Sequence, residues 1–326
     1  MAELRYNPLI KDWVMIASHR QDRPQMPKDW CPFCTGSGKV PQSYDVYKYD
    51  NDFPTLSQNP PPSDNVANDF FKVKQSYGKC EVILFSSEHN ASLREFSVPH
   101  ITKIVDLWAD RFTEISKDEK IKYVFIFENR GEMVGVTMPH PHGQIYGFSV
   151  IPKKIELELE ASKEYFEEKN KCLFCDMLKE EKAFEKRVIF SNEHFTVFLP
   201  FFSEYPYGVY IISNKHMNNI TLFNNEKKIA LAETIKHTTG MLDSLFGFNF
   251  PYMMCMHNAP VNIEDTSDFY HFHIEFFPPM RAADKQKFNA SSETGVWAHC
   301  NPTSPEDKAK ELREAYISFI NKCTNN

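Results

Sequence analysis

Apolar residues recur along the chain with two different periods, and these periods predict its main elements. Short apolar runs predict buried strands at residues 13–16, 80–85, 123–127, 207–212, 252–257 and 270–277. Apolar side chains at helical spacing predict three helices, at about 99–118, 153–170 and 225–246. The pattern therefore indicates a protein built from short strands and longer helices.

One polar motif stands directly before an apolar run, His140-Pro-His142-Gly-Gln144, followed by residues 145–151. Alternate residues of a strand point to the same face of a sheet. If the motif begins a strand, His140, His142 and Gln144 share one face. Two imidazoles and an amide would then lie side by side.

The same order of motifs occurs twice. A Cys-x-x-Cys pair, a strand ending in Ser-x-x-His, a helix, a strand and a His-x-His motif appear in each half, and the second copies follow the first by 127 to 141 residues. A repeat of this kind indicates duplication with later changes in the loops. We predict an N-terminal catalytic half at residues 1–165 and a related C-terminal half at 166–326.

Each half offers two thiolates and two imidazoles, the ligands of a closed tetrahedral zinc site. The ligands predicted for the first site are Cys31, Cys34, His89 and His140, and those predicted for the second are Cys172, Cys175, His216 and His271. Such sites leave no open position for a substrate, so we expect them to be structural. The first would fix the strand that carries His142.

His142 is then free to act as a nucleophile or general base. Gln144 is a neutral donor, suited to holding a phosphoryl oxygen, and it cannot protonate a leaving group at neutral pH. A leaving group that needs no proton, such as a phosphate, points to nucleotidyl transfer through a phosphohistidine. The second half has His273 and Glu275 at the matching positions, and an ionised Glu275 would repel a phosphate, so we expect that half to be non-catalytic.

Three further side chains, Arg20, Arg23 and Asn129, are candidates for phosphate or ribose contacts. Arginines three residues apart can also be solvated surface charges, which is the more common situation. The sequence alone leaves both interpretations open for the two arginines.

The composition of the chain limits the partners and the cellular compartment that we expect. The chain has 326 residues, 42% hydrophobic and 25% charged, with a net charge of -7. The negative charge and the absence of a basic block disfavour nucleic acid and membrane surfaces as partners. No apolar run approaches the roughly 20 residues of a membrane span, and the N-terminus lacks the apolar core of a signal peptide. We expect a cytoplasmic protein.

These motifs resemble those of the galactose-1-phosphate uridylyltransferase family, the transferase branch of the histidine triad superfamily. The resemblance covers nearly the whole chain and is most specific at the His-Pro-His-Gly-Gln motif. It extends to the segments at residues 18–24, 51–53, 127–131, 257–260 and 278–279, and to Lys287-Phe288. It implies an α+β fold of two related histidine-triad-like halves with antiparallel sheets and flanking helices, forming a half-barrel.

The resemblance also implies a reaction. His142 would take UMP from UDP-glucose in a ping-pong mechanism and pass it to galactose 1-phosphate, while Gln144 holds the phosphoryl oxygens. Arg20, Asn51, Asp52, Asn129 and Thr137 would contact the uridylyl group. Family members are usually homodimers, and the segment from Lys287 to Glu293 would reach the hexose site of the neighbouring subunit.

Three questions stay open on the sequence. Many family members bind a second metal, iron or zinc, through residues that match Glu158, His257, His271 and His273, and this chain has these as well as the second cysteine set. Repeat symmetry favours the cysteines. Residues 289–301 differ from better-known members, so a related transferase or phosphorylase acting on ADP-glucose is an alternative. A catalytically silent nucleotide-binding protein is disfavoured by the intact His142 and Gln144.

Overall fold

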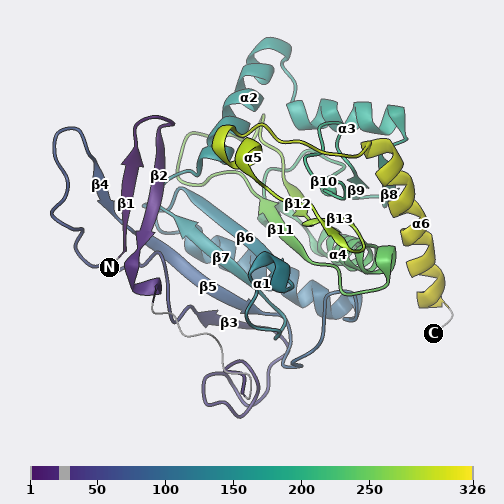
Figure 1. The fold of residues 1–326 in the computed structure, drawn as a ribbon, viewed down its shortest axis with the longest axis horizontal. Helices are drawn as coiled ribbons and strands as arrows, with labels where there is room; N and C mark the ends of the chain where they lie inside the picture. Colours follow the sequence, from purple (N-terminus) through teal and green to yellow (C-terminus); the bar gives the residue numbers. More distant parts are fainter. Residues whose placement is uncertain (1, 22–29, 325–326) are drawn as a thin grey trace.

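The computed structural model describes residues 2–21 and 30–324. Its centre is a nine-stranded sheet, and a three-stranded sheet of order β2-β1-β4 stands at one side of it (Figure 1). The small sheet consists of β1 (Ala2–Asn7), β2 (Asp12–Ala17) and β4 (Val73–Gln75). A short hairpin of β13 (Met280–Ala282) and β14 (Lys285–Gln286) lies near the C-terminal end.

The nine-stranded sheet joins the two halves of the chain through antiparallel pairs. Its strands, in spatial order, are β3 (Tyr47–Asp50), β5 (Gly78–Leu84), β7 (His142–Phe148), β6 (Tyr123–Arg130), β11 (Tyr252–His257), β12 (His273–Phe277), β10 (Tyr210–Ser213), β9 (Phe195–Phe198) and β8 (Val188–Ser191). The first half of the chain contributes β3, β5, β7 and β6, and the second half contributes β11, β12, β10, β9 and β8. Since β6 pairs directly with β11, the two halves share one open sheet.

The predicted helices are confirmed, and others join them. The longer helices are α1 (Val98–Ser116), α2 (Lys153–Lys169), α3 (Leu173–Phe184), α4 (Asn225–Phe246) and α6 (Pro305–Thr324). The shorter ones are α5 (Ser291–Val296) and the 3-10 turns η1 (Ser18–Arg20), η2 (Glu132–Val134) and η3 (Ile220–Leu222). The strand expected at 207–212 begins only at Tyr210, because Tyr207 belongs to a turn in which Gly208 N donates to Tyr205 O at 3.1 Å.

One face of the large sheet is apolar and is covered by helices. Ile104 and Trp108 of α1 are fully buried in a single core cluster with Ile126 of β6 and Ile145 of β7, and this cluster also takes in α4. The helix α1 begins where Ser97 Oγ accepts a bond from the N–H of His100, an N-cap arrangement. Because side chains alternate along each strand, those that do not face this apolar core point to the opposite face of the sheet.

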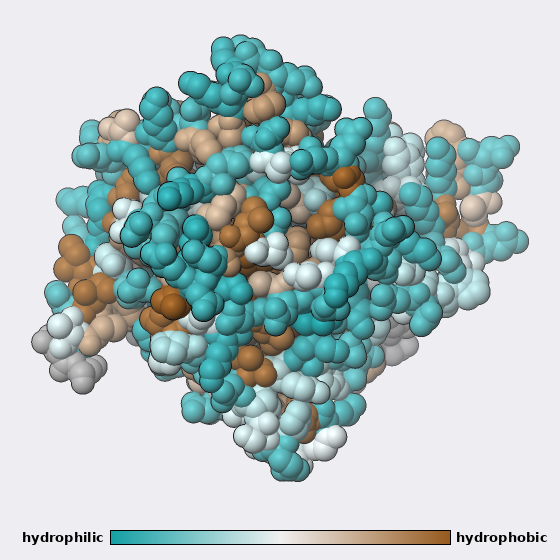
Figure 2. All heavy atoms as spheres, turned by 180° about the vertical axis from the view of Figure 1, so that it is seen from behind, coloured by the Kyte–Doolittle hydropathy of each residue, from teal (hydrophilic) through white to brown (hydrophobic). Residues whose placement is uncertain are grey.

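The surface is largely polar. The face seen from behind is mostly hydrophilic, with hydrophobic residues in small separate groups (Figure 2). Among the described residues, no helix combines the length and apolar character that crossing a membrane requires.

Candidate active site and metal-binding groups

The motif that dominated the sequence lies at the start of β7. His142, Gln144 and Tyr146 line one cavity, whereas Ile145 belongs to the core. His140 lies just before β7, which begins at His142, and its buried ring bonds the carbonyl of Ser86 in the loop after β5. The centre of the Phe33 ring lies 5.9 Å from that of His140 and 6.1 Å from that of His142. Gly143 faces the core too: a Cβ there would lie 2.9 Å from Phe127 O and from Phe85 Cζ. Its small size serves strand packing and not a substrate.

The His142 ring is held in one tautomer. Its Nδ1 lies 2.7 Å from the carbonyl oxygen of His140. A carbonyl only accepts, so Nδ1 carries the proton and Nε2 keeps the lone pair of a nucleophile. Gln144 is held by the hydroxyl of Tyr146, which donates to its Oε1 at 3.0 Å.

The cavity beside His142 has a volume of about 430 Å³. It gathers five of the predicted substrate residues, which are Arg20, Asn51, Asp52, Asn129 and Thr137. Arg23 lies outside the described residues. Asn129 stands at the end of β6, and Thr137 follows η2, a turn that closes with Gly135 at a φ of 80°.

A second cavity of about 370 Å³ lies next to the first. The two share His142, Asn129 and the segment from Val136 to Met138 as a common wall. His142 therefore borders both cavities. The second is lined further by residues 90–92, 130–132 and 139–141, by Glu128 and by Asn249.

The first predicted metal group is assembled. The donor atoms of Cys31, Cys34, His89 and His140 lie within 4.8 Å of one another. Cys34 Sγ is 3.3 Å from His89 Nδ1 and 3.8 Å from His140 Nδ1. The outer nitrogen of His140 bonds the carbonyl of Ser86 at 2.8 Å, which directs Nδ1 toward the sulfurs. Burial lowers the pKa of His140 to about 4 and keeps the ring neutral, the form that binds metals.

The second predicted group has the same construction. The donor atoms of Cys172, Cys175, His216 and His271 also lie within 4.8 Å of one another. Cys175 Sγ is 3.5 Å from His216 Nδ1 and 3.4 Å from His271 Nδ1. The outer nitrogens bond backbone carbonyls, His271 to Ser213 at 3.0 Å and His216 to Ser267 at 2.6 Å.

The alternative second set is not brought together as a unit. His271 lies with the cysteines, while Glu158, His257 and His273 meet Glu275 in a separate group. Glu275 is a member of this group that the sequence did not predict. From the sequence, we considered only the repulsion between its charge and a phosphate. Tyr146 was missed as well, although a period of two from His142 through Gln144 leads directly to it.

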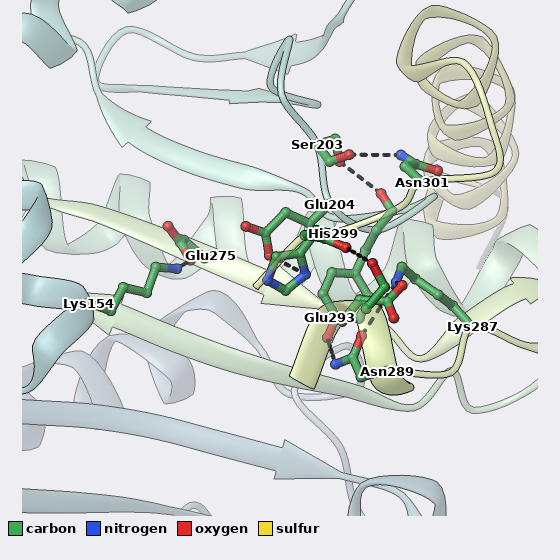
Figure 3. Close-up of polar contacts among 12 residues, drawn as sticks. Lys154, Ser203, Glu204, Glu275, Lys287, Asn289, Glu293, His299 and Asn301 are labelled. Carbon is green, nitrogen blue, oxygen red and sulfur yellow. Dashed lines mark hydrogen bonds and ion pairs between the residues drawn. The ribbon is translucent and has the colours of Figure 1, made fainter. Parts of the chain in front are cut away.

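Lys287 and Glu293 lie in the C-terminal segment and line neither cavity. Their side chains pair with each other at 3.4 Å (Figure 3). The segment is tied to the loop after β9: Asn289 Nδ2 donates to Tyr205 OH at 2.7 Å, and Asn301 Nδ2 donates to Ser203 O at 2.9 Å. This arrangement presents Phe288 to solvent with 71% of its surface exposed.

The chain is similar to known proteins over nearly its whole length. Two sequence models match, "Galactose-1-phosphate uridyl transferase, N-terminal domain" at residues 1–152 and the corresponding C-terminal domain at 158–308. A galactose-1-phosphate uridylyltransferase of Thermotoga maritima is 43% identical over 320 residues, which cover 98% of this chain and 100% of the relative.

Two solved structures extend the comparison. A uridylyltransferase superposes with a TM-score of 0.90 at 31% identity, covering 97% of this chain and 99% of its own. An ADP-glucose phosphorylase from Arabidopsis thaliana with bound ADP-glucose superposes with a TM-score of 0.74 at 25% identity, covering 96% and 99%.

Proposed function

This chain belongs to the galactose-1-phosphate uridylyltransferase family, and we propose that it moves UMP from UDP-glucose to galactose 1-phosphate through a covalent intermediate on His142. The observation that carries the mechanism is the bond from His142 Nδ1 to the carbonyl of His140, which puts the proton on Nδ1 and the nucleophilic lone pair on Nε2, in a ring that lines the cavity. The enzyme is a transferase of galactose metabolism.

The reaction has two displacements at the same phosphorus. Nε2 of His142 attacks the α-phosphorus of UDP-glucose, an N–P bond forms, and the P–O bond to glucose 1-phosphate breaks. A phosphate oxygen of galactose 1-phosphate then attacks the uridylyl phosphorus, and the N–P bond breaks to give UDP-galactose. Both leaving groups depart without a proton, so the Gln144 amide needs only to donate hydrogen bonds to the phosphoryl oxygens.

The uridylyl contacts are assigned to the larger cavity. Arg20 supplies positive charge for the phosphates, while Asn51, Asn129 and Thr137 offer neutral hydrogen-bonding groups on the same wall. The Asp52 carboxylate is already engaged by Tyr49 OH at 2.9 Å and by Lys39 at 3.5 Å, so it repels the phosphates less than a bare charge would. Arg23 remains part of this proposal on sequence grounds.

Zinc is the metal that best suits both cysteine–histidine groups, with iron as the alternative in the second. Two thiolates and two Nδ1 atoms face each other in each group. His140, His271 and His216 each bond a backbone carbonyl through Nε2, the nitrogen that points away from the sulfurs. Bound zinc would hold the loop of residues 31–34 to the residues just before β7. It would thereby support the placement of His142.

The setting proposed for the enzyme is the cytoplasm, as a homodimer that binds neither nucleic acid nor membrane. Support for a reducing compartment comes from the cysteines, which are all free. In the dimer, Lys287 and Glu293 of one protomer would contribute to the hexose site of its partner.

Two other functions compete with this one. The likeness to the ADP-glucose phosphorylase keeps ADP-glucose as an alternative nucleotide sugar. A silent nucleotide-binding protein would need neither the fixed tautomer of His142 nor the neutral Gln144. Only the covalent step distinguishes the enzymes from such a protein.

Labelling tests this step. The protein is incubated with UDP-glucose or ADP-glucose carrying ³²P at the α-phosphate, denatured, and examined for a covalent label that acid removes and base does not. We expect label from UDP-glucose on the wild-type protein and none on His142→Asn. Label from ADP-glucose alone would assign the alternative nucleotide, and label retained by His142→Asn would exclude His142 as the nucleophile.

A further inference from the structure

The group of Glu158, His257, His273 and Glu275 occupies, in the second half, the place of the active site in the first. Gln144 of β7 pairs with Val82 and Phe127, and Glu275 of β12 pairs with Tyr210 and Cys255 at the same relative positions. The donor atoms of the four residues lie within 4.8 Å of one another, close enough to suggest a third metal ion. The contacts around these four residues argue against such an ion.

Both carboxylates are already supplied with donors from the protein. Glu275 Oε1 accepts from Tyr210 OH at 2.6 Å, and its Oε2 accepts from the ammonium of Lys154. Glu158 Oε2 accepts from Tyr270 OH at 2.8 Å and pairs with His257 Nδ1 at 3.0 Å. Each of these three oxygens has a lone pair engaged by a hydroxyl or ammonium donor of the protein, so the carboxylate charges are compensated without an ion.

The His257 ring is also divided between the two carboxylates. Its Nδ1 faces Glu158 at 3.0 Å, and its Nε2 lies 3.8 Å from Glu275 Oε2. A single ion can be bound through only one of these nitrogens. The cysteine–histidine groups differ in this respect, because His271 and His216 turn their outer nitrogens to backbone carbonyls and both Nδ1 atoms toward the sulfurs.

Lys154 is the cation that balances this group. It reaches from the first turn of α2 to the Glu275 carboxylate (Figure 3). Its ammonium is also 4.0 Å from Glu158 Oε1 and 4.9 Å from the centre of the Phe277 ring. A buried carboxylate without a partner is costly, and either an ammonium or a metal ion can compensate it.

We propose that the Lys154 ammonium takes the place of a metal ion among Glu158, His257, His273 and Glu275. The resemblance to metal-binding family members does not extend to this group, and the chain binds two metal ions, one in each cysteine–histidine group. This inference is independent of which nucleotide sugar the enzyme uses.

Metal counting tests it on the full-length protein. The wild type and the variants Glu158→Gln, His257→Asn and Cys175→Ser are saturated with zinc or iron(II), desalted, and measured by inductively coupled plasma mass spectrometry. We expect two ions in the wild type, two in Glu158→Gln and in His257→Asn, and one in Cys175→Ser. A wild type with three ions, or a loss of one ion in Glu158→Gln, overturns the proposal.

A variant without the charge of Lys154 tests the role of this residue directly. Lys154→Met removes the ammonium and keeps most of the stem, so the vacated place should acquire a third ion at the same zinc concentration. The matched control is Lys153→Met, because Lys153 is the neighbouring residue of α2 and pairs with Glu156 at 3.0 Å instead. It should retain two ions. Two ions in Lys154→Met would show that Lys154 does not substitute for a metal.

Discussion

The hydroxyl of Tyr146 donates a hydrogen bond to Oε1 of Gln144 at 3.0 Å, within the strand that carries His142. The contact leaves the Gln144 amide nitrogen as the group that can donate to a phosphoryl oxygen. Tyr146 is 9% exposed and its ring packs edge-on against Phe127 at 5.1 Å, so the hydroxyl has little freedom to move. Tyr146 is thus a positioning residue for Gln144.

Removing that hydroxyl should slow turnover without weakening substrate binding to the same degree. A neutral hydrogen bond contributes about 1 kcal/mol, so Tyr146→Phe should lower kcat roughly fivefold and change KM little. Steady-state kinetics measures both. In a Gln144→Ala background the same substitution should have no further effect on kcat, and an equal loss in both backgrounds would mean that Tyr146 acts through the fold and not through Gln144.

Loss of one thiolate from the second cysteine–histidine group should halve the zinc content. Cys172→Ser removes a ligand from a set whose donor atoms lie within 4.8 Å of one another, and it leaves the first group untouched. Zinc is measured by mass spectrometry on desalted protein. Cys255→Ser is the control, since Cys255 lies outside both cysteine–histidine groups, and it should retain the full content. An unchanged zinc content in Cys172→Ser would show that the second cysteine–histidine group does not bind zinc.

Glu128 should make the protein less stable as the pH rises from about 4.5 to about 7. Burial raises the pKa of this carboxyl from 4.5 to about 7, against opposing effects of Arg130 and the Tyr252 hydroxyl. A pKa raised in the folded state means that folding binds a proton. The free energy of unfolding that Glu128 contributes is therefore fully present below about pH 4.5 and is lost as the pH rises toward 7, by about 3 kcal/mol.

Urea unfolding at several pH values measures that loss. Glu128→Gln keeps an oxygen that can accept from Tyr252 and removes the titration, so the decline between pH 4.5 and 7 should shrink by most of that amount. Glu132→Gln, an exposed neighbour, should leave the pH dependence unchanged. If Glu128→Gln shows the wild-type dependence, the carboxyl titrates normally in the folded protein.

Mixed dimers should reveal whether Lys287 works across the subunit boundary. Lys287→Ala and His142→Asn homodimers should both be nearly inactive. A heterodimer purified through two different tags would combine one intact His142 with the intact Lys287 of the other chain. It should recover about half of the wild-type activity, because one of two shared sites is complete. An inactive heterodimer would place Lys287 in its own chain's site.

The sequence predicted those parts of the molecule that depend on local period and on ligand chemistry. The apolar spacing of α1 and the pairing of each Cys-x-x-Cys motif with two histidines needed no knowledge of the fold. The start of β7 at His142 depends on pairing with Leu84, which is far away in sequence, so the local period alone could not fix it. The ion pair between Lys154 and Glu275 spans 121 residues and has no local signal.

The direct pairing of β6 with β11 has a consequence for how the chain folds. Phe127 lies opposite Cys255 along this pair, so each half covers what would otherwise be an open sheet edge of the other. A half produced alone would expose a row of unpaired backbone groups, a template for aggregation. Pairing across so long a stretch of chain also slows folding, since the loop must close before the contacts form. We therefore expect the two halves to reach a stable, soluble state only as one cooperative unit.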